Sequence, residues 1–183
     1  MTGRREVETD AGADHARQQA EAADGPDVMD GSPPPVAVHP PILFPAVLGV
    51  ALVLDRLAPL VTTPWPAPLR FGLGGLLVAL AMLLAGWAAW VFHRAGTAIP
   101  TFRPARRFVS SGPYAFTRNP MYLGLVLLLA GLGLMLASGW TLLFVPVFVA
   151  LMDRLVIARE EPYLEARFGD PYRAYLRRVR RWI

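Results

Sequence analysis

The sequence predicts an all-α integral membrane protein, a bundle of about four transmembrane helices followed by C-terminal interfacial amphipathic helices. Three observations lead to this prediction. The 183 residues are 54% hydrophobic, which is too apolar for an ordinary soluble domain. Four apolar segments each come close to the roughly 20 residues that a helix needs to cross a bilayer. The connections between these segments differ strongly in arginine content, as expected of a membrane protein with a fixed orientation.

Residues 1–40 are predicted to be a disordered tail, separate from a membrane domain over residues 41–183. The tail contains three arginines and eight acidic residues, ends in a proline-rich run and shows no apolar periodicity. Such a composition buries too little apolar surface to offset the entropy lost on ordering. No apolar core follows the basic start closely enough to predict a secretory signal peptide.

The four apolar segments are residues 42–60, 71–92, 121–137 and 140–158. A proline-rich turn at 63–68 separates the first two. Only Ser138 and Gly139 separate the last two, which predicts a tight helical hairpin. Backbone polar groups in lipid must be satisfied internally, and the segments lack the alternation of barrel strands, so they are predicted to be helices.

A few residues within these segments call for specific packing. Asp55 and Arg56 in the first segment are costly if they face lipid, and are predicted to be paired or to snorkel. Asp153 and Arg154 lie in the last turns of the fourth segment, where they either snorkel or line a site. The third segment carries small residues that allow a second helix to approach closely: Gly124, Ala130, Gly131 and Gly133.

Arginine placement predicts the orientation of the bundle. The connection over residues 93–118 contains five arginines and seven more follow the fourth segment, whereas the other two connections together contain only Arg70. Because basic residues favour the cytoplasmic side, both termini and the 93–118 connection are predicted to be cytoplasmic. Basic residues beside apolar segments suit an anionic lipid surface as partner, and no nucleic acid is expected.

The connection into the third segment has a composition that a simple spacer does not need. The stretch 106–124, RRFVSSGPYAFTRNPMYLG, combines arginines with turn-forming and aromatic residues and has no acidic residue. Such a mixture at a membrane surface indicates a pocket for a polar ligand. The third and fourth helices form a hairpin, so Glu160 and Glu161 are predicted to return to the same membrane face, beside residues 118–122.

The residues after the fourth segment predict two further helices. Pro162 suits the first turn of one helix and Gly169 its end, while Asp170 and Pro171 suit the N-cap and first position of the next. The last helix is amphipathic. Its apolar face contains Tyr172, Tyr175, Leu176, Val179 and Ile183, and its other face contains Arg173, Arg177, Arg178, Arg180 and Arg181. We expect this helix to lie on the inner leaflet, with its arginines toward anionic headgroups, and the terminal helices to roof the cytosolic site.

The predicted site combines adjacent carboxylates, an arginine and several tyrosines. Carboxylates accept hydrogen bonds from ammonium and hydroxyl groups, arginine binds a carboxylate in a fork, and tyrosine faces attract cations. These groups suit a zwitterion with an additional positive charge, such as S-adenosylmethionine. A phospholipid headgroup would suit the same groups, so the residues alone leave both ligands open. The chain has no cysteine, which excludes thiolate metal sites and cysteine nucleophiles, and no metal site is predicted.

Two motifs carry a more specific resemblance. The sequence GPYAFTRNPMYLG (112–124), followed by two apolar helices and then REEPYLEARFGDPYRAYLRRVRRW (159–182), resembles the isoprenylcysteine carboxyl methyltransferase family in its bacterial branch. Phospholipid methyltransferases are more distant relatives, and the resemblance covers residues 52–183. It implies a small bundle of membrane helices with a cytosolic S-adenosylmethionine pocket.

The resemblance also implies which residues contact the cofactor. The family's His-Pro-x-Tyr motif falls on residues 119–122, its upstream turn on Gly112 and Tyr114, backbone contacts around 106–109, and its glutamate pair on Glu160 and Glu161. The cofactor-binding residues predicted in this way are Val109, Gly112, Tyr114, Arg118, Asn119, Pro120, Met121, Tyr122, Glu160 and Glu161. Glu160, Glu161 and Tyr122 are also predicted to be catalytic.

Two positions depart from the family pattern. Asn119 replaces the histidine of the eukaryotic enzymes, and asparagine cannot shuttle a proton near neutral pH. Val156 stands where those enzymes have an arginine, four residues before the first glutamate. Recognition of a prenylated cysteine carboxylate is therefore not transferred. His93 is expected only to cap the second segment.

Together, these features predict methyl transfer from S-adenosylmethionine to a lipophilic acceptor at the membrane. Carboxylate O-methylation is what the family resemblance implies. One alternative is N-methylation of a phospholipid amine. Another is a non-catalytic module that binds an anionic lipid or a partner through the arginine-rich last helix. Neither the acceptor nor the oligomeric state follows from the sequence.

Overall fold

The computed structural model describes residues 38–60, 65–96 and 108–183, and the regular elements within these ranges are all helical. In chain order they are α2 (Pro40–Leu57), α3 (Ala67–Arg94), the 3₁₀ turn η1 (Gly112–Ala115), α4 (Pro120–Met135), α5 (Gly139–Met152), the π-helical turn η2 (Asp153–Ile157) and α6 (Ala158–Arg178). The tail predicted over residues 1–40 lies outside the described residues up to position 37.

The predicted all-α membrane bundle is confirmed. Three helices in the described part are long and apolar enough to cross a membrane: Pro40–Leu57, Ala67–Arg94 and the helical run Gly139–Arg178, which bends at Gly169. The remaining apolar segment forms α4, which is shorter at 16 residues. The fourth segment does not stop at residue 158 as the apolar run does, because α5 continues through η2 into α6 without a break.

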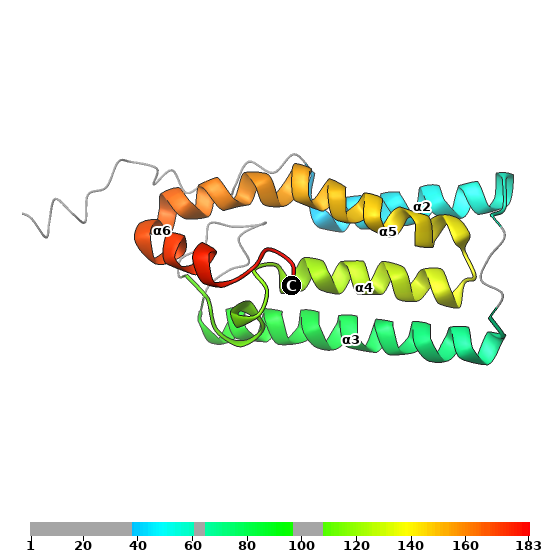
Figure 1. The fold of residues 1–183 in the computed structure, drawn as a ribbon, viewed down its shortest axis with the longest axis horizontal. Helices are drawn as coiled ribbons and strands as arrows, with labels where there is room; N and C mark the ends of the chain where they lie inside the picture. The colour runs from blue at the N-terminus through cyan, green and yellow to red at the C-terminus, as the bar shows by residue number, and fades with distance from the viewer. Residues whose placement is uncertain (1–37, 61–64, 97–107) are drawn as a thin grey trace, which may run out of the picture. The chain divides into compact units, whose positions relative to one another are not determined.

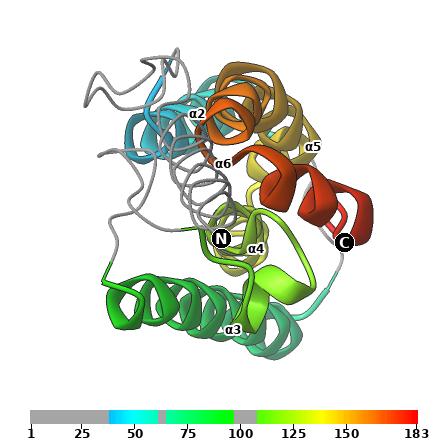
Figure 2. The same cartoon turned by 90° about the vertical axis from the view of Figure 1, so that its left-hand side faces the viewer.

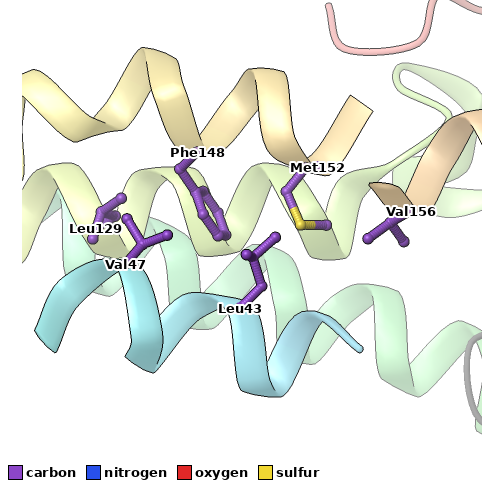
Figure 3. Close-up of a cluster of buried hydrophobic side chains, with 6 residues drawn as sticks. All are labelled: Leu43, Val47, Leu129, Phe148, Met152 and Val156. Carbon is purple, nitrogen blue, oxygen red and sulfur yellow. The ribbon is translucent and has the colours of Figure 1, made fainter. Parts of the chain in front are cut away.

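Helix α4 lies between the other spans. It packs against α3 on one side and α5 on the other, while α2 packs against α5 (Figures 1 and 2). Apolar side chains from three of these helices and from η2 meet in one cluster, shown in Figure 3: Leu43, Val47, Leu129, Phe148, Met152 and Val156. This cluster fixes the axis of α5 and η2, and so the point at which α6 leaves the bundle.

The contact between α3 and α4 depends on the predicted small residues. A Cβ atom added to Gly131 would lie 2.8 Å from the backbone oxygen of Gly74, and one added to Gly124 would lie 3.2 Å from the backbone oxygen of Ala81. The two helix backbones are therefore almost in direct contact, as small residues allow in membrane helices. Gly133 faces α5, where its added Cβ would lie 2.8 Å from the Leu142 side chain.

The charged residues Asp55 and Arg56 lie near the C-terminal end of α2, beside the turn between α4 and α5. Asp55 accepts a hydrogen bond from the Ser138 hydroxyl and lies 3.5 Å from the Trp140 backbone nitrogen, while the Trp140 indole donates to the Ala58 carbonyl at 2.7 Å. Asp55 is therefore paired, as predicted, and it joins α2 to the turn between α4 and α5. Arg56 is exposed.

The chain turns sharply within α6. Gly169 has φ 57° and ψ −134°, a non-helical conformation that glycine adopts without steric cost. The predicted helix end at Gly169 is thereby confirmed, and the last part of α6 folds back toward the start of α4 (Figure 1). Tyr172 and Tyr175 on this part are only 4% and 3% exposed. Protein therefore covers both side chains, in agreement with the prediction that the terminal helices roof the site.

The α3–α4 contact gives a first testable prediction. Gly131→Ala should destabilise the protein by about 1–3 kcal/mol, because the added methyl group overfills a closed helix contact. Gly75→Ala is the matched control, since nothing lies within 4 Å of its added Cβ. That control should be neutral or slightly stabilising, because alanine favours a helix over glycine. The measurement is the thermal unfolding midpoint in detergent, and equal midpoints for the two variants would contradict the proposed packing.

Candidate functional site

The turn η1 brings the first part of the site against α3. Gly112 has φ +62°, and an added Cβ would lie 2.9 Å from Val91 and 3.3 Å from the Trp87 indole nitrogen. Only glycine fits this close turn without strain. The turn buries Tyr114, whose ring meets Phe92 edge-on with 5.2 Å between ring centroids. This contact anchors the linker before α4 to the end of α3.

The linker then enters α4 at Asn119 and Pro120. Pro120 is well placed at the helix start, where its missing N–H costs nothing. Asn119 occupies the N-cap position, but its side chain makes no capping hydrogen bond. Its amide instead donates to the Arg181 carbonyl at 3.0 Å. The side chain thus joins two segments that lie 62 residues apart in the sequence.

The two predicted motifs meet at Tyr122 and Glu160. The Tyr122 hydroxyl lies 2.8 Å and 2.9 Å from the two carboxylate oxygens of Glu160. Glu160 is only 6% exposed, and a buried carboxylate is stable only when it is hydrogen-bonded. The convergence predicted for Glu160 with residues 118–122 is therefore present in the structure.

Glu161 forms a second link between the motifs. Arg118 Nη1 donates to Glu161 Oε1 at 2.8 Å, and Arg181 Nη2 binds the other carboxylate oxygen. The Arg181 Nη1 atom also lies 3.5 Å from an oxygen of Asp153. Two guanidinium groups therefore share one carboxylate. The hydrogen bonds to Glu161 raise the pKa of Arg181 above its usual value, so that it stays charged.

Aromatic rings that the sequence did not predict complete the site. Phe108 contacts Phe168, Tyr172 and Tyr175, with ring centroids 5.7, 5.7 and 5.2 Å apart. The Tyr175 hydroxyl donates to the Tyr114 carbonyl at 2.7 Å. The one feature of the sequence that could have indicated these rings is the i, i+3 spacing of Tyr172 and Tyr175, just after the helix-ending Gly169. That spacing marks one helix face but does not identify what covers it.

These side chains surround one cavity. Its empty volume is about 740 Å³, counting space that is open to solvent. All but one of the predicted cofactor-binding residues line it: Val109, Tyr114, Arg118, Asn119, Pro120, Met121, Tyr122, Glu160 and Glu161. Phe92, Ile157 and Leu164 add apolar surface. Gly112 is absent from this lining and borders a separate hollow beside Trp87 and Arg94.

Other residues considered from the sequence do not line the cavity. His93 is an exposed residue in the last turn of α3, and Asp153 and Arg154 lie outside the lining. Val156 is fully buried in the apolar cluster, so this position presents no polar group to a ligand. The backbone contacts expected at residues 106 and 107 lie outside the described residues.

The protonation state of Tyr114 limits its chemistry. Burial, with smaller contributions from nearby Tyr175 and Glu160, raises the pKa of the Tyr114 phenol well above its usual value. Tyr114 therefore stays neutral at physiological pH and does not serve as a tyrosinate base. Its ring and hydroxyl remain available for packing and hydrogen bonding.

Most of the residues that line the cavity lie in a stretch that matches a known family. A comparison with protein families matches residues 69–171 to the family described as phospholipid methyltransferase. The chain belongs to this family. The family is part of the isoprenylcysteine carboxyl methyltransferase-like superfamily of membrane methyltransferases, so the resemblance found in the sequence is confirmed.

Two curated proteins are similar to this member of the family. An uncharacterized protein of Haemophilus influenzae is 46% identical over 63 residues, which cover 34% of this chain and all of that protein. The cobalt-zinc-cadmium resistance protein CzcN of Cupriavidus metallidurans is 33% identical over 115 residues, which cover 63% of this chain and 49% of that protein. The match with CzcN thus spans about half of that protein's length.

Membership of the family indicates a membrane methyltransferase with lipid-like substrates. Methyltransferases of this family typically use S-adenosylmethionine. The fold agrees with an enzyme that works at a bilayer, because its candidate membrane spans carry the cavity at one end of the helix bundle.

The buried tyrosine contact gives a second prediction. Tyr175→Phe should lower the free energy of unfolding by about 1–3 kcal/mol, because it leaves the buried Tyr114 carbonyl without a donor. The matched control is Tyr163→Phe on the same helix, because the Tyr163 hydroxyl is buried and has no hydrogen-bond partner in the described part of the chain. The control should be neutral. A Tyr175→Phe protein that melts with the control would show that this bond does not hold the site.

Proposed function

We propose that this protein is an S-adenosylmethionine-dependent methyltransferase whose acceptor is lipophilic and reaches the cavity from the bilayer. One observation carries the proposal. The Tyr122–Glu160 and Arg118–Glu161 contacts bring two distant motifs together around a single cavity with aromatic walls. A purely structural contact between two helices would not need paired carboxylates, an arginine and several tyrosines in one hollow.

The donor groups of the cavity fit the parts of S-adenosylmethionine. Glu160 and Glu161 suit its ammonium and ribose hydroxyl groups, and the ring faces of Phe108, Tyr172 and Tyr175 suit its adenine and its positive sulfur. Arg118 contributes an observation of its own. Its Nε atom is buried and has no hydrogen-bond partner among the described residues. A ligand carboxylate would supply that partner.

The chain's own residues would contribute mainly by positioning. When bound, the cofactor supplies an electrophilic methyl group on its sulfonium. The aromatic and apolar lining excludes water, and the fixed Tyr122–Glu160 pair orients the ligand, so the two reactants meet in near-attack geometry. A carboxylate acceptor needs no base. For an amine acceptor, Glu160 is the nearest candidate for the proton, because Glu161 is held by two arginines.

Two lines of support point to different chemical classes of acceptor. The resemblance to isoprenylcysteine carboxyl methyltransferases supports carboxylate O-methylation. The family match supports a lipid-like substrate and keeps amine N-methylation of a phospholipid as the alternative. The buried Val156 stands where the eukaryotic enzymes have an arginine that would bind a prenylcysteine carboxylate, so that specific substrate is not proposed.

The proposed topology places the cavity in the cytoplasm. Among the described residues, Arg94, Arg118 and the seven arginines from Arg159 onward lie at the cavity end of the bundle, and basic residues favour the cytoplasmic side. Both termini are then cytoplasmic. We assign residues 41–183 to the methyltransferase domain and residues 1–40 to a separate tail.

Cofactor binding provides the direct test. Glu160→Gln and Tyr122→Phe should each raise the Kd for S-adenosylmethionine by about tenfold, because each removes part of a buried, charge-assisted contact. Glu165→Gln is the matched control on α6, since that side chain is exposed and forms an ion pair with the exposed Arg173. Isothermal titration of the detergent-solubilised protein gives the values. Binding that both site variants leave unchanged would refute the site assignment.

The nature of the acceptor is tested in membranes. Membrane extracts that contain the protein and methyl-labelled S-adenosylmethionine should yield a labelled lipophilic product, and the Glu160→Gln extract should yield much less. Label released by mild base indicates a carboxyl methyl ester, whereas stable label in an aminophospholipid indicates N-methylation. No labelled product above that of a protein-free extract would favour the non-catalytic lipid-binding module.

A further inference from the structure

Residues 180–182, here called the strap, lie beside the site without belonging to the cavity lining. The Arg180 carbonyl accepts from the Arg118 backbone nitrogen at 3.0 Å. The Arg181 carbonyl accepts from both the Thr117 hydroxyl and the Asn119 side-chain amide, at 3.2 Å and 3.0 Å. The strap thus binds three consecutive residues of the linker that leads into α4.

Side chains of the strap bind the other half of the site. The Arg181 guanidinium binds the Glu161 carboxylate in a bidentate manner: Nη2 donates to one oxygen and Nε lies 3.2 Å from the other. The Trp182 indole donates to Asp153 at 3.2 Å, and its ring packs against the apolar cluster of Figure 3. The strap therefore contacts the linker, η2 and α6 at once.

This arrangement gives the two adjacent glutamates different surroundings. Glu160 meets Tyr122 inside the cavity. Glu161 is held between Arg118, which lines the cavity, and Arg181, which does not. A bidentate arginine–carboxylate pair fixes both the position and the orientation of the carboxylate. Arg181 therefore determines where Glu161 lies, and Glu161 in turn fixes the Arg118 guanidinium.

We propose that Arg181 is a positioning residue of this site, which acts through Glu161 to hold Arg118 and the linker in the geometry that binds the cofactor. This inference rests on the proposed function, since it assigns the purpose of the strap to the same cavity. It also distinguishes the two glutamates, because both line the cavity but only Glu161 connects the strap to Arg118.

A double-mutant cycle tests whether Arg181 acts through Glu161. Arg181→Ala should raise the Kd for S-adenosylmethionine roughly tenfold, as expected for loss of a charge-assisted contact that orders the site. Arg181→Lys keeps the charge without the planar fork and should fall between wild type and Arg181→Ala. In a Glu161→Ala background, Arg181→Ala should add little, because residues that work as one unit are not additive.

The control is Arg178→Ala, which removes the same charge from an exposed position on α6. Its Kd should match wild type. If Arg181→Ala binds like Arg178→Ala, or if its effect is undiminished in the Glu161→Ala background, the proposal is overturned. All titrations are done well below the unfolding midpoint of each variant, so that a simple loss of folded protein does not imitate weaker binding.

A second measurement needs no cofactor. Amide hydrogen exchange of peptides that span residues 114–124 should be faster in Arg181→Ala than in Arg178→Ala, because the Arg118 amide loses its acceptor when the strap detaches. Equal exchange in the two variants would overturn the strap. If wild type does not bind S-adenosylmethionine but exchange still responds to Arg181→Ala, the proposed cofactor fails while the positioning of the linker stands.

Discussion

The site depends on one constraint: the adjacent carboxylates of Glu160 and Glu161 need hydrogen-bond or ion-pair partners. Both residues lie at the start of α6, where the chain leaves the apolar bundle. Glu160 is buried almost completely, and an unpaired buried carboxylate would cost several kcal/mol. Its partner Tyr122 and the Glu161 partner Arg118 both come from the start of α4. The same contacts that stabilise these charges therefore bring the linker, α4 and α6 together around the cavity.

The rest of the fold places those partners with little freedom. The glycine contact between α3 and α4 sets the depth of α4, and the apolar cluster around Phe148 and Met152 fixes α5 against it. The π-helical turn η2 then carries the chain into α6, and π-turns inside α-helices are frequent at functional sites. Gly169 lets the last part of α6 fold back over the cavity. The packing of the membrane helices therefore determines the geometry of the site.

The sequence predicted the elements whose cause is local. Apolar length predicted the spans, the hairpin placed Glu160 beside Tyr122, and the conformational freedom of glycine predicted the break at Gly169. It predicted that the terminal helices roof the site, but not which of their residues line the cavity, because an amphipathic helix shows the same pattern whether lipid or protein covers its apolar face. The position of Gly112 in the family motif suggested a ligand contact. In the structure, a positive φ and close packing on α3 are what require a glycine at this position. The sequence also predicted Glu161 beside residues 118–122, but no local pattern reveals that Arg181 from the folded-back chain end binds the same carboxylate.

We propose that the linker before α4 and the folded-back part of α6 form two walls of one nucleoside-binding cavity. Ultraviolet crosslinking of labelled S-adenosylmethionine, followed by peptide mapping, tests it most directly. We expect saturable labelling of peptides from both walls, residues 108–122 and 157–175, and competition of both labels by unlabelled cofactor. Label confined to one wall, or found instead at the hollow beside Trp87 and Arg94, would contradict it.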